Sequence, residues 1–251
     1  MLLPSEVSVR IGVYVDGYNL YYGGRSLCGR GQPGWRWLDL RAVAIRIVRS
    51  QSRWAGAHVE RIVYCTARIK GSSNPGGQQD QDTYLRALVA ARSVDHIEFG
   101  TYVSRTARSP LAIPDSNGAP QLVTSQWPVM IQDATGSSIP DARFMVSYAK
   151  REEKGSDVNV ATHLLLDVTR GAVDAAVVIS NDSDLRLPIV EARRLVPVGT
   201  VNPTSGHLAG ALRGTRDEGA ARHWWYQLRP ADFTTCQLPA KIDRLHTPPG
   251  W

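Results

Sequence analysis

An acid-rich turn directly after a short apolar run constrains this chain more than any other feature. The run, from Ala175 to Ile179, is apolar and β-branched, which is typical of a buried strand. Ser180, Asp182 and Asp184 follow it at once. Two carboxylates are therefore expected at the carboxyl end of a buried strand, which is the end at which open α/β sheets bind their ligands.

Two further acidic positions fit the same pattern. The apolar run 11–15 leads straight into Asp16, and Asn19 follows three residues later. Asp157 opens an amphipathic segment, 157–169, whose apolar residues recur at helical spacing. Three acidic positions that are far apart in the sequence thus lie at matching ends of the expected elements. They predict one common site.

The order of the expected elements indicates an α/β fold with a mainly parallel sheet wrapped by helices. Residues 104–142 interrupt this order with five prolines and several Gly, Ser and Asn residues, which predicts a β-hairpin-like insertion and not a second domain. We expect one domain over residues 7–202. Residues 203–251 are expected to form a C-terminal extension that packs on it.

Composition limits the classes of protein to which the chain can belong. The 251 residues are 43% hydrophobic, which suffices for a sizeable core, and no apolar stretch is long enough to span a membrane. Residues 1–6 lack the pattern of a secretory signal. The three cysteines are odd in number and without CxxC spacing, which favours a reducing, cytoplasmic location. The net charge of +6 favours polyanionic partners only weakly.

The aspartates are the candidate ligands of a metal ion. Hard cations such as Mg²⁺ and Mn²⁺ prefer carboxylates and water, and they serve phosphoryl chemistry by polarising the phosphate and activating a water. Each aspartate alone could equally be a helix cap or a turn residue, but the joint pattern at strand ends favours a metal site. The set consists of Asp16, Asp157, Asp182 and Asp184.

Polar and basic residues near the acids are candidate partners of a phosphate or of a water. Asn19 and Ser180 could orient a water or a carboxylate, or could be ordinary turn residues. Basic side chains could hold a polymer's phosphates, or could simply be solvated at the surface. The basic candidates are Arg25, in an expected Gly- and Arg-rich loop after residue 21, Arg68 and Lys70 after the second strand, and Lys154.

Three motifs resemble those of the NYN family, the LabA-like group of PIN-like ribonucleases. They are Val13–Leu20, Lys154–Ala161 and Val178–Pro188. The resemblance, which includes the order and spacing of the three motifs, spans roughly residues 10–202. The resemblance implies a PIN-like, Rossmannoid α/β/α sandwich and metal-dependent hydrolysis of RNA. The family often has an Asp where this chain has His163, so that one outer acid is missing.

Carried over by position, the four aspartates match the family's acidic site, Asn19 its asparagine and Lys154 its Lys-Gly pair. We therefore expect a cytoplasmic ribonuclease that uses Mg²⁺ or Mn²⁺ and binds no membrane. Asp16, Asp157 and Asp182 would hold the metal, while Asp184 would bind a second ion or orient water. The alternatives are a catalytically weak RNA-binding protein, or a regulatory protein that acts through a protein partner at 104–142. A homodimer is also compatible with the sequence.

Overall fold

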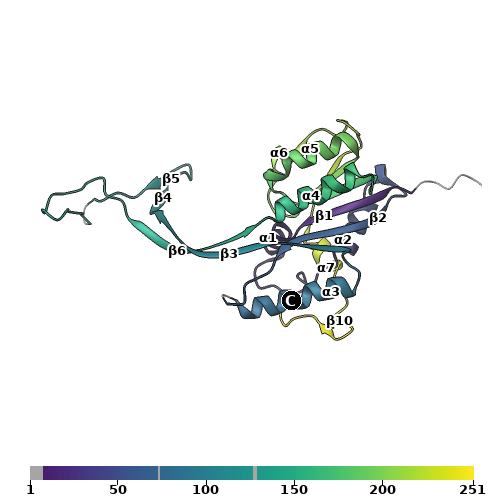
Figure 1. Ribbon diagram of the computed structural model, residues 1–251, viewed down its shortest axis with the longest axis horizontal. Coiled ribbons are helices and arrows are strands. Elements are labelled where there is room, and N and C mark those ends of the chain that lie inside the picture. Colours follow the sequence, from purple (N-terminus) through teal and green to yellow (C-terminus); the bar gives the residue numbers. More distant parts are fainter. Residues whose placement is uncertain (1–7, 73, 127–128) are drawn as a thin grey trace, which may run out of the picture. The chain divides into compact units, whose positions relative to one another are not determined.

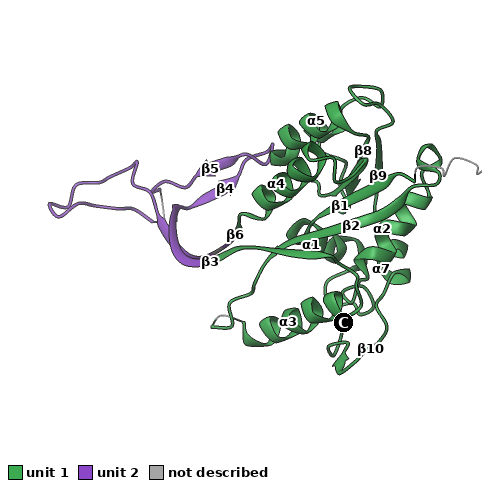
Figure 2. Cartoon of the chain, turned by 45° about the vertical axis from the view of Figure 1, so that its right-hand side comes forward, with its two compact units in different colours: residues 1–102, 153–251 green, residues 103–152 purple. Residues whose placement is uncertain are grey.

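The computed structural model describes residues 8–72, 74–126 and 129–251, and its chain divides into two compact units. The first unit contains the described part of 1–102 together with 153–251, and the second contains the described part of 103–152 (Figure 2). The insertion expected at 104–142 lies within the second unit. Residues 1–6, which lack the pattern of a secretory signal, fall outside the described residues.

A mostly parallel sheet is the framework of the first unit. Its strand order is β6-β3-β2-β1-β7-β8-β9, and the pairs from β3 to β9 are parallel. The strands are β1 (Arg10–Asp16), β2 (His58–Ala67), β3 (His96–Pro110), β6 (Met145–Lys154), β7 (Ala175–Ile179), β8 (Val198–Asn202) and β9 (Trp224–Gln227). The α/β class expected from the sequence is therefore confirmed at this level.

Helices cover both faces of the sheet (Figure 1). One apolar cluster joins one face of β1 to α1, α2, α3 and α7, and a second joins the other face to α4 and α5. Because the central strands are buried on both sides, β1 and β7 read as continuous apolar runs. The helices are α1 (Gly17–Cys28), α2 (Leu40–Arg49), α3 (Pro75–Ala90), α4 (Ser156–Thr169), α5 (Arg186–Leu195), α6 (Gly210–Arg213) and α7 (Pro230–Thr235).

Helix α1 occupies the stretch where the sequence suggested a Gly- and Arg-rich loop. That expectation is wrong because Gly23 and Gly24 serve close packing and do not break the helix. A Cβ at Gly23 would lie 2.2 Å from the carbonyl oxygen of Pro203, and one at Gly24 would lie 2.7 Å from the ring of Phe233. The two glycines therefore let α1 approach its neighbours more closely than any larger residue would permit.

Helix α3 begins at Pro75, directly after Asn74. The side chain of Asn74 caps the helix by accepting the N–H of Gly77, and proline is well suited to the first helical turn. None of the described helices is long and apolar enough to cross a membrane.

The C-terminal extension contributes more than packing, because it adds a strand to the sheet. β9 pairs with β8 in parallel, and α7 packs against α1 through a core that includes Phe233. A short ladder, β10 (Lys241–Ile242) with β11 (Leu245–His246), follows. Trp224 is buried at the start of β9.

The second unit consists of strands with few buried side chains. The outer parts of β3 and β6 belong to it, and β4 (Ala112–Pro114) and β5 (Pro120–Leu122) form an antiparallel hairpin. Isolated antiparallel bridges, such as that between Thr124 and Arg143, join other parts of this unit. Most of its large apolar side chains, among them Ile113 and Met130, are exposed.

Candidate functional site

Four aspartates from three elements meet at the carboxyl ends of the central strands in the first unit. Asp16 ends β1, and Asp182 and Asp184 follow β7, which pairs with β1 in parallel. Asp157 lies in the first turn of α4, which packs over β1 and β2. The charges of the other three raise the pKa of the Asp157 carboxyl, so all four lie within electrostatic reach of one another.

Asp16 is the most buried of these acids, with 2% of its surface exposed. Its carboxylate accepts the backbone N–H of Asn19 at 3.0 Å and the hydroxyl of Ser180 at 2.8 Å. Burial raises the pKa of Asp16 to about 6, although both hydrogen bonds oppose the rise, and Glu153 and Asp182 add to it. Asp16 therefore titrates close to neutral pH.

Asn19 and Ser180 hold the acidic loop in shape. The hydroxyl of Ser180, which is fully buried, also accepts the backbone N–H of Asp182 at 3.0 Å. The side-chain oxygen of Asn19 accepts the backbone N–H of Asn181 at 3.1 Å. Asp182 in turn accepts the N–H of Asp184 and caps a short 3-10 turn. The observed contacts of Asn19 and Ser180 thus link β1 to the loop after β7.

Asp157 is half-buried, and its pKa is raised to about 7. Burial is the largest cause, and the charges of Asp16, Asp182, Glu153 and Asp184 follow. Like charges gathered in one place disfavour each other's ionisation, so Asp157 holds its proton to a higher pH than Asp16 does. It is also more accessible than Asp16, which makes it the better placed of the two to exchange a proton with a bound molecule.

Glu153 belongs to the same cluster, and sequence reasoning missed it. Its carboxylate accepts the backbone N–H of Ser156 at 3.1 Å and also the hydroxyl of Ser156. It contributes to the raised pKa values of Asp16, Asp157 and Tyr18. A signal was present in the sequence, because a glutamate three residues before the first residue of a helix can accept a free N–H of the first turn.

Three tyrosines on α1 form an exposed aromatic strip beside the acids. Tyr18, Tyr21 and Tyr22 are each more than 40% exposed, and the ring centroids of Tyr18 and Tyr22 are 4.5 Å apart. The pKa of Tyr18 is raised to about 12 by burial and by its hydrogen bond with Tyr22, with Tyr102 and Glu153 also contributing. Tyr18 therefore joins the aromatic strip to the acidic cluster.

The predicted basic residues lie in different places. Arg25 is in the last turn of α1, with its guanidinium 5.7 Å from the ring centroid of Tyr22. Lys154 is exposed at the end of β6, directly before α4. Arg68 pairs with Asp82 at 2.6 Å and stacks over Phe99, and it lines a groove together with Lys70. Arg25 thus lies on the helix that Asp16 caps, and Lys154 lies between Glu153 and the helix of Asp157, whereas Arg68 and Lys70 line the groove.

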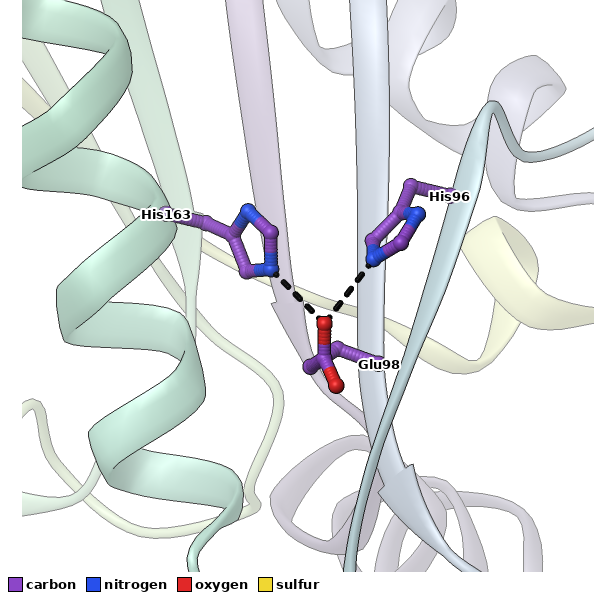
Figure 3. Close-up of side chains that lie close together, drawn as sticks. All are labelled: His96, Glu98 and His163. Carbon is purple, nitrogen blue, oxygen red and sulfur yellow. Dashed lines mark hydrogen bonds and ion pairs between the residues drawn. The ribbon is translucent and has the colours of Figure 1, made fainter.

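A second cluster, on β3 and α4, was not expected from the sequence. His96, Glu98 and His163 direct their polar atoms toward one point (Figure 3). The register places Cys65 of β2 between Asp16 and Glu98, so this cluster and the aspartates lie on the same face of the sheet. Residues 96 and 98 are two positions apart on a strand, so their side chains lie on the same face. This spacing was the signal in the sequence that could have indicated the pair.

Comparison with known proteins identifies one relative by name. 6-Hydroxy-3-succinoylpyridine 3-monooxygenase HspA of Pseudomonas putida is 30% identical over 259 aligned positions, which cover 96% of this chain and 73% of HspA. The chain belongs to the HspA family. No family model matches the chain, so the resemblance to the NYN family stays a prediction. A solved protein of unknown function from Vibrio parahaemolyticus is 16% identical, with a TM-score of 0.45, over 92% of this chain and 99% of its own.

Membership of the HspA family corrects the functional interpretation of the sequence. HspA is named for a monooxygenation, which is an oxidation and not the hydrolysis of RNA. The predicted ribonuclease function, the hydrolase class and the Mg²⁺ or Mn²⁺ cofactor are therefore wrong. The error has a physical origin, because carboxylates at strand ends suit proton transfer as well as metal binding, and a shared fold does not fix the chemistry. RNA as a partner followed from the same interpretation and stays a prediction.

Proposed function

We propose that this protein is an oxidoreductase that monooxygenates a hydroxylated, nitrogen-containing aromatic ring. The observation that carries the proposal is the 30% identity to HspA along 96% of the chain. In such a reaction one atom of O₂ enters the substrate and the other leaves as water. The balance requires two protons and two electrons, which we assign to a reduced nicotinamide or a reduced flavin supplied from solution.

The acidic cluster supports this proposal through proton transfer. The pKa values of Asp16 and Asp157, raised to about 6 and about 7, suit groups that take up and return a proton near neutral pH. Positions 3 and 6 of a pyridine ring, which the name of HspA specifies, lie opposite each other. Removing the proton of a 6-hydroxyl group therefore enriches the carbon at position 3 in electrons, and that carbon becomes reactive toward oxygen. In the ring without a substituent at position 3, the new C–O bond replaces a C–H bond. In 6-hydroxy-3-succinoylpyridine it replaces the bond to the succinoyl group, which leaves as an aldehyde and takes two further electrons and two further protons from the reductant.

We assign distinct roles to the residues of the cluster. Asp157 is the base that takes the hydroxyl proton of the ring, because it is more exposed than Asp16. Asp16 and Glu153 keep the proton affinity of Asp157 high through their charges. Ser180 and Asn19 fix the positions of Asp16 and of the loop after β7. The tyrosine strip of Tyr18, Tyr21 and Tyr22 offers aromatic faces on which a flat ring can stack.

A resident flavin adenine dinucleotide does not fit the turn after β1. Dinucleotide-binding turns use a glycine-rich sequence, so that the backbone and the start of the following helix can approach the pyrophosphate. Here the turn reads Asp16-Gly17-Tyr18-Asn19, and the carboxylate of Asp16 already caps α1. A negative charge at this point repels a pyrophosphate. We therefore treat the reductant as a dissociable co-substrate.

We also propose a PIN-like form of the α/β sandwich and a cytoplasmic location. The first is supported by the acids at the ends of β1 and β7 and at the start of α4, in the order of the three NYN-like motifs. The second is supported by Cys28, Cys65 and Cys236, which are all free thiols. A second copy of the chain, or a protein partner bound through 104–142, stays a prediction.

The test of the proposed function is incorporation of isotopically labelled O₂. The protein would be incubated with 6-hydroxy-3-succinoylpyridine, or with 6-hydroxypyridine, together with reduced nicotinamide, added flavin and added Fe²⁺. We expect mass spectrometry to find one labelled oxygen atom in the product, and Asp157→Asn to slow the reaction by at least about 100-fold. Asp217→Asn, whose side chain is 82% exposed, is the matched control and should react normally. A folded wild-type protein that incorporates no label would refute the proposal.

A further inference from the structure

Two histidines and one glutamate converge on a single point between β3 and α4. The Nε2 atom of His96 lies 3.0 Å from Oε2 of Glu98, and the Nε2 atom of His163 lies 3.2 Å from the same oxygen. The ligand atoms of all three side chains lie within 4.8 Å of one another, and the two imidazole rings are 5.0 Å apart (Figure 3). All three residues belong to the first unit of the chain.

We propose that His96, Glu98 and His163 bind one ferrous ion. Two imidazoles and one carboxylate on one side of a metal, with the remaining positions open, are the ligand set of non-haem iron oxygenases. Ligand atoms about 2.1 Å from a metal and at right angles to each other lie about 3.0 Å apart. The two observed separations from Glu98, 3.0 and 3.2 Å, match this spacing, and the ligand atoms of the two histidines lie within 4.8 Å of each other.

The surroundings of the cluster favour a ligand over a purely structural contact. Both histidines turn to the same oxygen of Glu98, although a carboxylate has two oxygens to share between two donors. The side chains of His96 and Glu98 are 41% and 39% exposed, so an ion and a small molecule can reach them. An ion pair this exposed contributes little to stability on its own.

The position of the cluster suits an oxygen-binding metal beside the acidic cluster. Asp16 is in register with Cys65, and Cys65 is in register with Glu98. Adjacent strands are about 4.8 Å apart, which places the Cα atoms of Asp16 and Glu98 about 10 Å apart. His163 lies six residues after Asp157 on α4, or about 9 Å along the helix axis. A ring held at the acids is thus within reach of the metal.

The role of the iron rests on the proposed function, whereas its binding does not. If the protein is a monooxygenase, His96, Glu98 and His163 would hold the iron with open positions for oxygen chemistry, and the reduced nicotinamide or flavin would supply the electrons that reduce the second oxygen atom to water. Binding of iron can be measured without substrate, reductant or oxygen. The two proposals can therefore fail separately.

The experiment is anaerobic titration of the chelator-treated, full-length protein with Fe²⁺, followed by desalting and elemental analysis. We expect one iron per chain in the wild type, and at least about a tenfold weaker affinity in His96→Gln, Glu98→Gln and His163→Gln. His58→Gln is the matched control, because His58 and Glu60 form the same His-x-Glu pair on β2 at 3.0 Å without a second histidine. Asp16→Asn should keep its iron.

Several results would overturn the iron site. They are a wild-type protein that retains no iron, equal retention in the three cluster variants, and loss of iron in Asp16→Asn in place of those variants. Far-ultraviolet circular dichroism of each variant checks that it is folded. Bound iron without labelled product refutes the proposed function and leaves the metal site standing. Labelled product from iron-free protein supports the proposed function and refutes the role of iron in it, while the titration alone decides whether the site binds iron.

Discussion

Replacing Asp16 with asparagine should reverse its effect on stability between acidic and basic pH. Burial raises the pKa of this carboxyl from an ordinary 3.8 to about 6. At about 1.4 kcal/mol for each pKa unit, the wild type loses about 3 kcal/mol of its free energy of unfolding as the pH rises through this range. The loss occurs because the unfolded chain ionises first, so that the contribution is complete only below the unfolded pKa.

Asparagine has no charge to lose, so the variant escapes this cost. Its side-chain oxygen can still accept the N–H of Asn19, but its amide meets the Ser180 hydroxyl as a donor, and that mismatch costs about 1 kcal/mol at every pH. Asp16→Asn should therefore be less stable than the wild type by about 1 kcal/mol near pH 3 and more stable by about 2 kcal/mol near pH 8. Relief of Asp157 acts in the same direction.

Urea unfolding of both proteins at the two pH values measures this difference. Asp217→Asn, an exposed aspartate with its nearest cation 3.8 Å away, should follow the wild type at both pH values and is the control. The reasoning fails if the free energies of Asp16→Asn and the wild type differ by the same amount at both pH values. That outcome would mean that Asp16 ionises in the folded protein as it does in water.

Three further changes probe the site and its support. Gly100→Ala should destabilise the protein by about 1–3 kcal/mol in thermal unfolding, because a Cβ there would lie 2.5 Å from the carbonyl oxygen of Lys154. Leu164→Ala, at a fully buried position of α4, should cost about 2–5 kcal/mol in urea unfolding and would contradict the packing if it cost nothing. If Asp157 is the base, kcat/KM should rise between about pH 5 and about pH 8 in the wild type but stay flat in Asp157→Asn.

The sequence predicted the layered part of the structure well because that part depends on local pattern. Ala175 to Ile179 is buried on both faces, and a strand in that setting must be apolar throughout. The convergence of Asp16 with the loop after β7 followed from the parallel order of the strands. The chemistry did not follow, because the same carboxylates suit either a metal or a proton.

Other features were out of reach because they depend on contacts across the chain. Gly23 and Gly24 indicate a loop by composition, and only the neighbouring Pro203 and Phe233 explain why a helix needs them. The meeting of His163 with His96 joins residues 67 positions apart, from a helix and a strand whose pairing no local pattern specifies. Sequence spacing alone could bring only His96 and Glu98 to one face of a strand.

The strand contributed by the C-terminal extension sets the smallest piece of this chain that can fold cleanly. The three motifs and the domain expected from them end before residue 203. A fragment of residues 7–202 would therefore contain every motif. Such a fragment would lack β9 and would leave the fully buried strand β8 with a row of unpaired N–H and C=O groups. Apolar edges of this kind recruit other chains. The fragment that ends at residue 202 would therefore aggregate, and failure to purify it would say nothing about catalysis.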